Sequence, residues 1–155
     1  MLKYFFENNF FSYLLSDNNK KLCTYKHFKT RYCSEPYLKY IENPFERKQL
    51  TCYRISAHNL KIERGRYQNQ ERSNRLCTLC NSGEIEDELH FLMNCNYYKD
   101  IRQKYLHAIF VDSLLTRWEQ FLYLMQTADC DIIRNVSCFL NEAFEKRNAT
   151  IAIRA

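Results

Sequence analysis

The sequence predicts a mainly α fold. Only 2 Gly and 2 Pro occur among 155 residues, so the tight turns that hairpin-rich β folds require are scarce. Apolar residues recur at helical spacing in several segments, most clearly in residues 130–153. The length suits a compact domain with its own hydrophobic core. We therefore expect a helical domain.

Residues 1–60 are expected to form an N-terminal helical segment. Residues 1–16 have aromatic residues near helical spacing, so this helix should pack on the body or, alternatively, on a larger neighbour. Residues 21–41 predict two helical pieces separated at Ser34-Glu35-Pro36. Asn43 followed by Pro44 is typical of a helix start and predicts a helix from Pro44 to about Ala57.

Residues 97–155 are expected to form C-terminal helices that pack with the N-terminal segment as one compact unit. The first covers residues 97–109, and the second should be capped by Asp112 or Ser113. The apolar stripe of the second helix would be Leu115, Trp118, Leu122 and Met125. The longest helix, residues 130–153, should direct six residues inward: Ile133, Val136, Phe139, Leu140, Ala143 and Phe144.

Between these segments, residues 61–96 contain a pattern of metal-ligand residues. Cys77, Cys80, His90 and Cys95 follow the spacing Cys-x2-Cys-x9-His-x4-Cys. Three thiolates and one imidazole can complete a tetrahedron around Zn²⁺, which would leave no open position for a reactive water. A redox Cys pair or unrelated buried thiols are the alternatives. The favoured interpretation is a structural zinc site in a small ββα-like CCHC knuckle, inserted in the helical domain after an extended basic connector that bends at Gly65.

The other five cysteines show no paired spacing and are expected to be core thiols: Cys23, Cys33, Cys52, Cys130 and Cys138. The N-terminus has no uninterrupted apolar core of a signal peptide, and no apolar run reaches the ~18 residues of a spanning helix. An intracellular location, in the cytoplasm or nucleus and away from membranes, is therefore expected. Thiols remain reduced there and available to metals.

Charge is unevenly distributed along the chain. The net charge is +5, but residues 47–75 contain eight Arg and Lys residues against two Glu residues. An acidic run follows at once, with Glu84, Glu86, Asp87 and Glu88. Runs of this kind are usually solvated faces. Arginines clustered next to a zinc module favour a phosphate-binding surface.

The central region resembles a known family. It is similar to the C-terminal zinc region of non-LTR (LINE-type) retrotransposon reverse transcriptases, in which three motifs occur in the same order. These are a helix ending in His-x-Leu, then Ile62-Glu63 with Gly65-Arg66-Tyr67, and then Glu86-Asp87-Glu88 with His90-Phe91 and Cys95. The resemblance implies zinc ligation by Cys77, Cys80, His90 and Cys95, and phosphate contacts from Arg64, Arg66, Arg72 and Arg75. Neither the paired aspartates of a polymerase palm nor a Pro-Asp nuclease motif is found, so the chain resembles a tail detached from its polymerase.

Three functions follow from these features. The leading hypothesis is a non-catalytic, zinc-stabilised module that binds RNA or DNA with low sequence specificity, with Tyr67 stacking on an unpaired base. The alternative is a structural or protein-interaction domain that docks to a polymerase or self-associates through residues 1–16. An enzyme is disfavoured, because His27, His58 and His107 are isolated from any nucleophile pattern.

Overall fold

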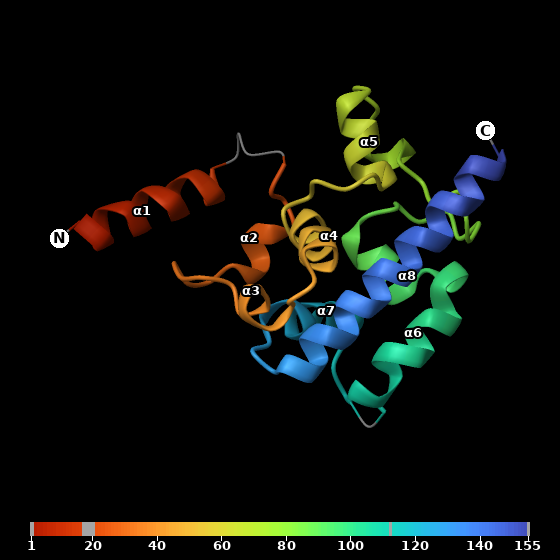
Figure 1. Cartoon of the computed structure of the whole chain (residues 1–155). Helices are drawn as coiled ribbons and strands as arrows, with labels where there is room; N and C mark the ends of the chain where they lie inside the picture. Colours follow the sequence, from red (N-terminus) through yellow and green to blue (C-terminus); the bar gives the residue numbers. More distant parts are fainter. Residues whose placement is uncertain (1, 17–20, 112, 155) are drawn as a thin grey trace.

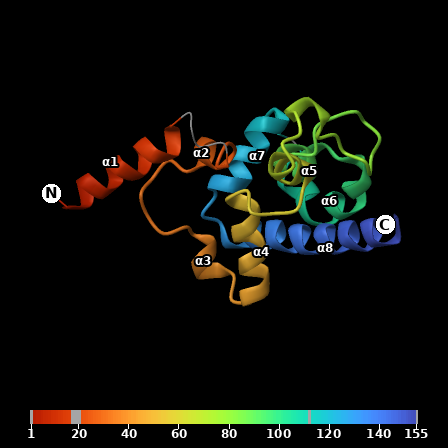
Figure 2. The same cartoon turned by 90° about the horizontal axis from the view of Figure 1, so that it is seen from above.

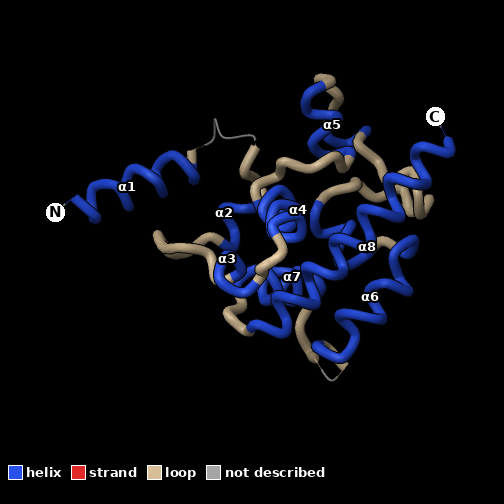
Figure 3. The backbone as a smooth tube through the Cα atoms, viewed as in Figure 1, coloured by secondary structure: helices blue, strands red, loops and turns tan. Residues whose placement is uncertain are grey.

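The computed structural model describes residues 2–16, 21–111 and 113–154. Within these ranges the chain is mainly helical, as predicted, and no strand forms (Figure 3). A π-helical segment, His90–Asn94, and short 3₁₀ turns join the α-helices. The α-helices are α1 Leu2–Leu15, α2 Tyr25–Phe28, α3 Tyr37–Tyr40, α4 Pro44–Arg54, α5 Lys61–Tyr67, α6 Lys99–Leu106, α7 Arg117–Gln126 and α8 Cys130–Arg154.

The core is built around α8, which crosses the whole body of the molecule (Figures 1 and 2). Helices α3, α4 and α6 pack against it. All six residues predicted to point inward from this helix are buried, and the Phe144 ring lies 4.6 Å from the ring of Phe91. Phe91 follows directly after a predicted metal ligand, so the metal region and the long helix share one hydrophobic core.

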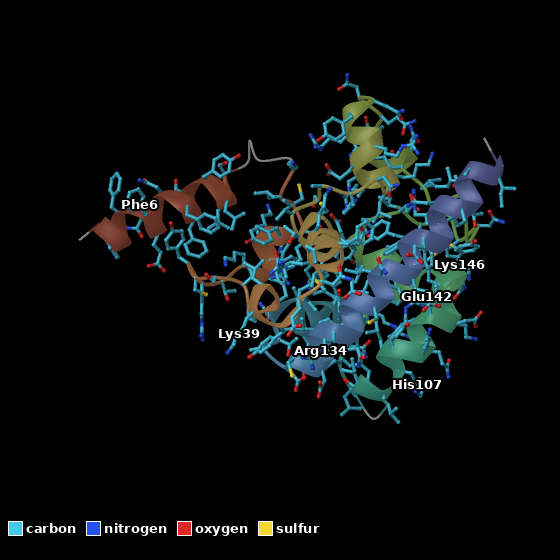
Figure 4. All side chains as sticks on the ribbon, viewed as in Figure 1. Phe6, Lys39, His107, Arg134, Glu142 and Lys146 are labelled. Carbon is cyan, nitrogen blue, oxygen red and sulfur yellow. The ribbon has the colours of Figure 1, made fainter. Side chains whose placement is uncertain are left out.

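Helix α1 projects away from this body (Figure 2). The prediction that it packs on the body is therefore wrong for most of its length. Tyr4, Phe5 and Phe6 are 71, 61 and 54% exposed, and Phe6 points to solvent in Figure 4. The C-terminal half of the helix reaches the body, where Leu14 is buried and the Phe10 ring lies 5.4 Å from that of Tyr32.

Helix boundaries follow side-chain caps. The predicted start of α4 is confirmed, since Asn43 Oδ1 accepts hydrogen bonds from the backbone N–H groups of Phe45 and Glu46. The predicted start of α7 is wrong, because Thr116 caps it in a reciprocal capping box with Glu119. Ser113 lies upstream of this cap, and Asp112 lies outside the described residues.

The later start of α7 changes which residues it buries. Of the predicted stripe only Met125 is buried, while Leu115 and Trp118 are 44 and 38% exposed. Phe121 and Leu124 enter the core in their place. The five remaining cysteines also differ from expectation, since Cys23 and Cys33 are exposed and the other three are only partly buried. No helix in the described ranges has the length and apolar character needed to cross a membrane.

Candidate metal centre

Cys77, Cys80, His90 and Cys95 come together at one point between α5 and α6. Their ligand atoms all lie within 4.8 Å of one another. Sγ of Cys77 is 3.9 Å from Sγ of Cys95, and Sγ of Cys80 is 3.3 Å from Nε2 of His90. Three of the four residues are buried and Cys80 is partly buried. This cluster can hold a metal ion.

The predicted ββα knuckle is not the scaffold that brings these residues together. Where two strands were expected, Leu76 and Ile85 form an isolated antiparallel bridge, and Cys77 N–H donates to Glu84 O. This bridge closes the loop that carries Cys77 and Cys80. Positive φ angles at Asn81 and Gly83 turn the loop back, and nothing lies within 4 Å of a Cβ placed on Gly83.

A π turn sets the spacing of the other two ligands. Cys95 N–H donates to His90 O at 2.7 Å, a bond that spans five residues where an α-helix spans four. The wider turn brings Cys95 to the same side as His90. Arg102 on α6 holds the end of this turn, because its guanidinium donates to the carbonyl oxygens of Leu92 and Cys95 at 2.7 and 2.9 Å.

Glu84 orients the imidazole of His90. Its carboxylate lies 2.6 Å from Nδ1, which directs Nε2 toward the thiols. Burial alone would lower the pKa of His90, but hydrogen bonds to Cys77, Glu84 and Cys80 raise the pKa to about 9. A carboxylate behind a ligating histidine is the usual arrangement at metal sites, because it fixes the ring and raises its basicity.

The buried thiols of Cys77 and Cys95 lie 3.9 Å apart, and each shifts the pKa of the other. The hydrogen bond from Cys95 lowers the pKa of Cys77 to about 3, and the resulting thiolate raises the pKa of Cys95. A metal ion needs its cysteine ligands as thiolates and its histidine ligand neutral, so binding would release protons from the cluster and strengthen as the pH rises.

The acidic run after the Cys-x-x-Cys turn is built into the structure. Glu86 is 2% exposed and pairs through both oxygens with Arg147 of α8 at 2.9 Å. Glu88 is 3% exposed and accepts from Ser56 at 2.6 Å, with His58 Nε2 at 3.0 Å. These partners are distant in sequence, with Arg147 61 residues from Glu86 and with Ser56 and His58 32 and 30 residues from Glu88, so no local pattern identifies them.

Glu88 remains ionised in this network. Burial would raise its pKa, but the hydrogen bonds from His58 and Ser56 hold the pKa below its usual value. His58 also accepts from Leu60 N–H through Nδ1 at 3.4 Å. These contacts give His58 a structural role.

The basic connector predicted before the metal ligands is not extended. Its first part is helix α5, and Gly65 lies inside this helix and not at a bend. A Cβ on Gly65 would approach Cγ of Arg75 to 2.6 Å and Oε1 of Gln70 to 2.9 Å. The glycine therefore gives room for Arg75, which folds back onto the helix.

The five predicted nucleic-acid contacts divide into two groups. Arg75 has a structural role, donating to Ile62 O at 2.9 Å and to Gln70 O at 2.6 Å. Arg66 pairs with Glu63 at 2.7 Å and lies 4.4 Å over the ring of Tyr67. The remaining three side chains face solvent: Arg64 is exposed, Tyr67 is 70% exposed, and Arg72 is 57% exposed beside Asp87 at 3.4 Å.

Comparisons with known proteins do not add to this geometry. No protein-family model matches the sequence, and neither the curated proteins nor the solved structures contain a match.

Proposed function

We propose that this chain is a non-catalytic, zinc-stabilised module that binds single-stranded nucleic acid through helix α5. The observation that carries the proposal is the position of α5. This helix projects from the body (Figure 1), its start is hydrogen-bonded to the loop that carries the candidate metal ligands, and Arg64 and Tyr67 are exposed on it one helical turn apart.

Zinc is the ion that best fits the ligand set. A tetrahedron with Zn–S of about 2.3 Å and Zn–N of about 2.05 Å has S···S edges of about 3.8 Å and S···N edges of about 3.6 Å. Here the Cys77–Cys95 S···S edge is 3.9 Å, the Cys80–His90 S···N edge is 3.3 Å, and all four ligand atoms lie within 4.8 Å of one another. Four protein ligands satisfy this geometry without a water, so the ion would stabilise the fold and would not act on a substrate. Such a site requires reduced thiols, which fits an intracellular location.

The metal region and α5 are joined by direct hydrogen bonds. Glu86 accepts from Lys61 N–H through its carboxylate at 2.8 Å and from Ile62 N–H through its backbone oxygen at 3.1 Å. Arg75, two residues before Cys77, binds Ile62 O. An ion that fixes the loop from residue 77 to residue 95 would therefore also fix the start of α5 and the direction in which it projects.

Binding would combine charge and stacking. Arg64 and Arg72 would contact phosphates, while Tyr67, with Arg66 lying over its ring, would stack on an unpaired base. Phosphate contacts carry little sequence information, so specificity should be low and affinity should fall steeply with salt. Arg75 is omitted from this interface because its hydrogen bonds are made within the protein.

The first experiment measures the metal. Native mass spectrometry of protein purified under reducing conditions should find one zinc per chain, and the Cys80→Ser variant should lose it. A Cys33→Ser variant is the matched control, since Cys33 is exposed and distant in sequence from the cluster. Folded wild-type protein without metal would contradict the proposal.

The second experiment measures nucleic-acid binding. Fluorescence anisotropy with a labelled single-stranded RNA at 50 and 200 mM salt should show binding that weakens strongly at the higher salt. Arg64→Gln with Tyr67→Ala should weaken it further, whereas Lys48→Gln on α4, also an exposed cation, should leave it unchanged. Absent or salt-independent binding would overturn the proposal.

We also propose an origin for the module in the C-terminal region of a non-LTR retrotransposon reverse transcriptase. Its support is the order and spacing of the motifs around residues 47–106. The proposal on binding does not depend on this origin, since it is argued from the exposed side chains of α5.

A second candidate function, self-association through α1, is favoured by a specific observation. The aromatic side chains at residues 4–6 are exposed, and a hollow of about 400 Å³ beside the same helix is lined by Phe10, Tyr25, Tyr32 and Leu38. The exposed half of α1 in one copy could fill this hollow in a second copy. Apolar surface of this kind is costly in water unless it is covered.

Light scattering distinguishes a dimer from a monomer. Phe5→Ser with Phe6→Ser should convert a dimer to a monomer, and Leu114→Ser, which removes a fully exposed leucine elsewhere, should not. A monomeric wild-type protein at high micromolar concentration would exclude this second function.

A further inference from the structure

A cleft separate from α5 lies between α6 and α7, beside the metal cluster. Its volume is about 560 Å³, within the ~300–1,000 Å³ of small-molecule sites. One part of its wall is cationic, with Lys99, Arg102 and Arg117. Among the described residues that line it, none is acidic. A neighbouring hollow of about 370 Å³ shares the same three cations and extends toward the metal loop, where Glu84 lines it.

The two arginines are held in place by contacts within the protein. Arg102 donates through Nε and Nη2 to the backbone oxygens of the π turn. Arg117 Nη1 donates to Oε1 of Gln120 at 3.1 Å, and Gln120 is 6% exposed. Two fixed guanidinium groups in one cleft repel each other unless an anion lies between them. Two carboxylates near these arginines are engaged elsewhere: Glu119 by Thr116 in the capping box, and Glu84, which lines the neighbouring hollow, by Nδ1 of His90 at 2.6 Å.

The rest of the cleft is apolar and contains flat rings. Leu106, Phe110 and Leu115 line it together with the imidazole of His107, and His107 lies at the lower end of α6 in Figure 4. Gln103 adds an amide that can both donate and accept. A ligand that fits both parts of the wall has a phosphate at one end and a planar, hydrogen-bonding ring at the other.

We propose that this cleft binds one nucleotide unit, with its phosphate on Lys99, Arg102 and Arg117 and its base against Phe110 and His107. The proposal extends the proposed function, since the nucleotide would belong to the strand that α5 contacts. Paired guanidinium groups are well suited to phosphate because each can donate two parallel hydrogen bonds. A nucleotide bound in the cleft would give the strand a second contact site, so that the strand would extend from α5 to the cleft alongside the metal centre.

The test titrates ¹⁵N-labelled, zinc-loaded protein with adenosine monophosphate and, separately, with inorganic phosphate. Amide signals of residues 99–120 should shift, and the monophosphate should bind at least about ten-fold more tightly than phosphate alone, since it also fills the apolar part. Arg117→Gln with Lys99→Gln should weaken its binding by roughly ten-fold or more. Arg134→Gln, an exposed arginine on α8, is the matched control. Arg102 is left intact because it supports the π turn.

Three outcomes would overturn the proposal. The first is a double variant that keeps the wild-type melting curve and also the wild-type nucleotide affinity. The second is equal affinity of the wild type for phosphate and nucleotide. The third is a set of amide chemical-shift changes confined to residues outside the cleft. RNA binding that depends on Arg64 and Tyr67 but not on Lys99 and Arg117 would remove the cleft and leave the proposed function standing. Nucleotide bound in the cleft of a protein that binds no RNA would support the cleft and remove the proposed function.

Discussion

Arg147 and Glu86 form a fully buried, two-bond ion pair between α8 and the loop that carries the metal ligands. The side chains are 1 and 2% exposed, and Nε and Nη2 of the arginine each lie 2.9 Å from one carboxylate oxygen. Glu86 also accepts from Lys61 N–H at the start of α5. One carboxylate therefore joins the core helix, the metal loop and the projecting helix.

Breaking this pair should be strongly destabilising. Arg147→Met leaves a buried carboxylate without its partner, and we expect a loss of about 3–5 kcal/mol in the free energy of unfolding. Replacing both residues, with Glu86→Gln added to Arg147→Met, should cost less than the sum of the single changes. Urea denaturation of the wild type, the two single variants and the double variant gives a double-mutant cycle. The control is Lys104→Met, which breaks an exposed pair with Glu142 and should leave the free energy of unfolding unchanged. Additive effects of the two single changes would contradict the prediction.

Glu84 should control metal affinity without being a ligand. Glu84→Ala removes the carboxylate that orients His90, so zinc affinity should fall by about 10- to 100-fold. Glu84→Gln retains an acceptor for Nδ1–H, so its zinc affinity should fall by less than that of Glu84→Ala. Competition with a chromophoric chelator measures both, and Glu71→Ala, another exposed glutamate near the loop, is the control. Equal affinities for all variants would show that Glu84 does not orient the ring.

Glu35 should make stability depend on acid. Burial favours its neutral form, but the charge of Arg54 and the hydrogen bond from Lys29, each at 2.7 Å, hold the pKa below the ordinary 4.5. Because the folded-state pKa is the lower one, the stabilisation is complete above about pH 5 and is lost as the pH falls through the folded-state pKa. Glu35→Gln should cost about 2 kcal/mol at pH 7 and flatten the decline in stability below pH 5.

Thermal melts between pH 3 and 7 measure this decline. Glu145→Gln, an exposed glutamate on α8, should leave the slope below pH 5 as it is in the wild type. A Glu35→Gln protein with the full acid dependence would show that other carboxylates are responsible.

Gly65→Ala should destabilise α5 although alanine favours helices. The helix gains about 1 kcal/mol from alanine. The new Cβ, however, would lie 2.6 Å from Cγ of Arg75 and would displace the side chain that binds Ile62 O and Gln70 O. Overpacking typically costs 1–3 kcal/mol, so a net loss of about 1 kcal/mol is expected in urea denaturation. A more stable variant would show that Arg75 repacks freely.

Features carried by local spacing could be predicted from the sequence. The four candidate ligands lie within one short stretch, and the inward face of α8 follows a regular period over many turns. The cap of α7 is also carried by local sequence, since Thr116-Arg117-Trp118-Glu119 is a capping-box pattern, although Asp112 or Ser113 was the predicted cap. Helix α5 was missed because it is short and contains a glycine.

Features that depend on distant residues could not be predicted in this way. Arg54 was counted among the residues of a basic surface, yet it is 6% exposed, pairs with Glu35 and lies over the rings of Phe28 and Tyr37. Likewise, no pattern near Glu86 identifies Arg147 as its partner. A run of charges in a sequence gives the net field of a segment, but only the tertiary fold decides which charges remain available to a ligand.

The π turn between His90 and Cys95 makes the motif sensitive to chain length. Deleting one residue between them would restore ordinary α-helical hydrogen bonding, but would rotate Cys95 by about 100° around the helix axis. Substitutions at Leu92 or Met93 that preserve volume leave this count unchanged. Variants of this protein that retain the centre should therefore tolerate changes of side chain in this turn far better than insertions or deletions.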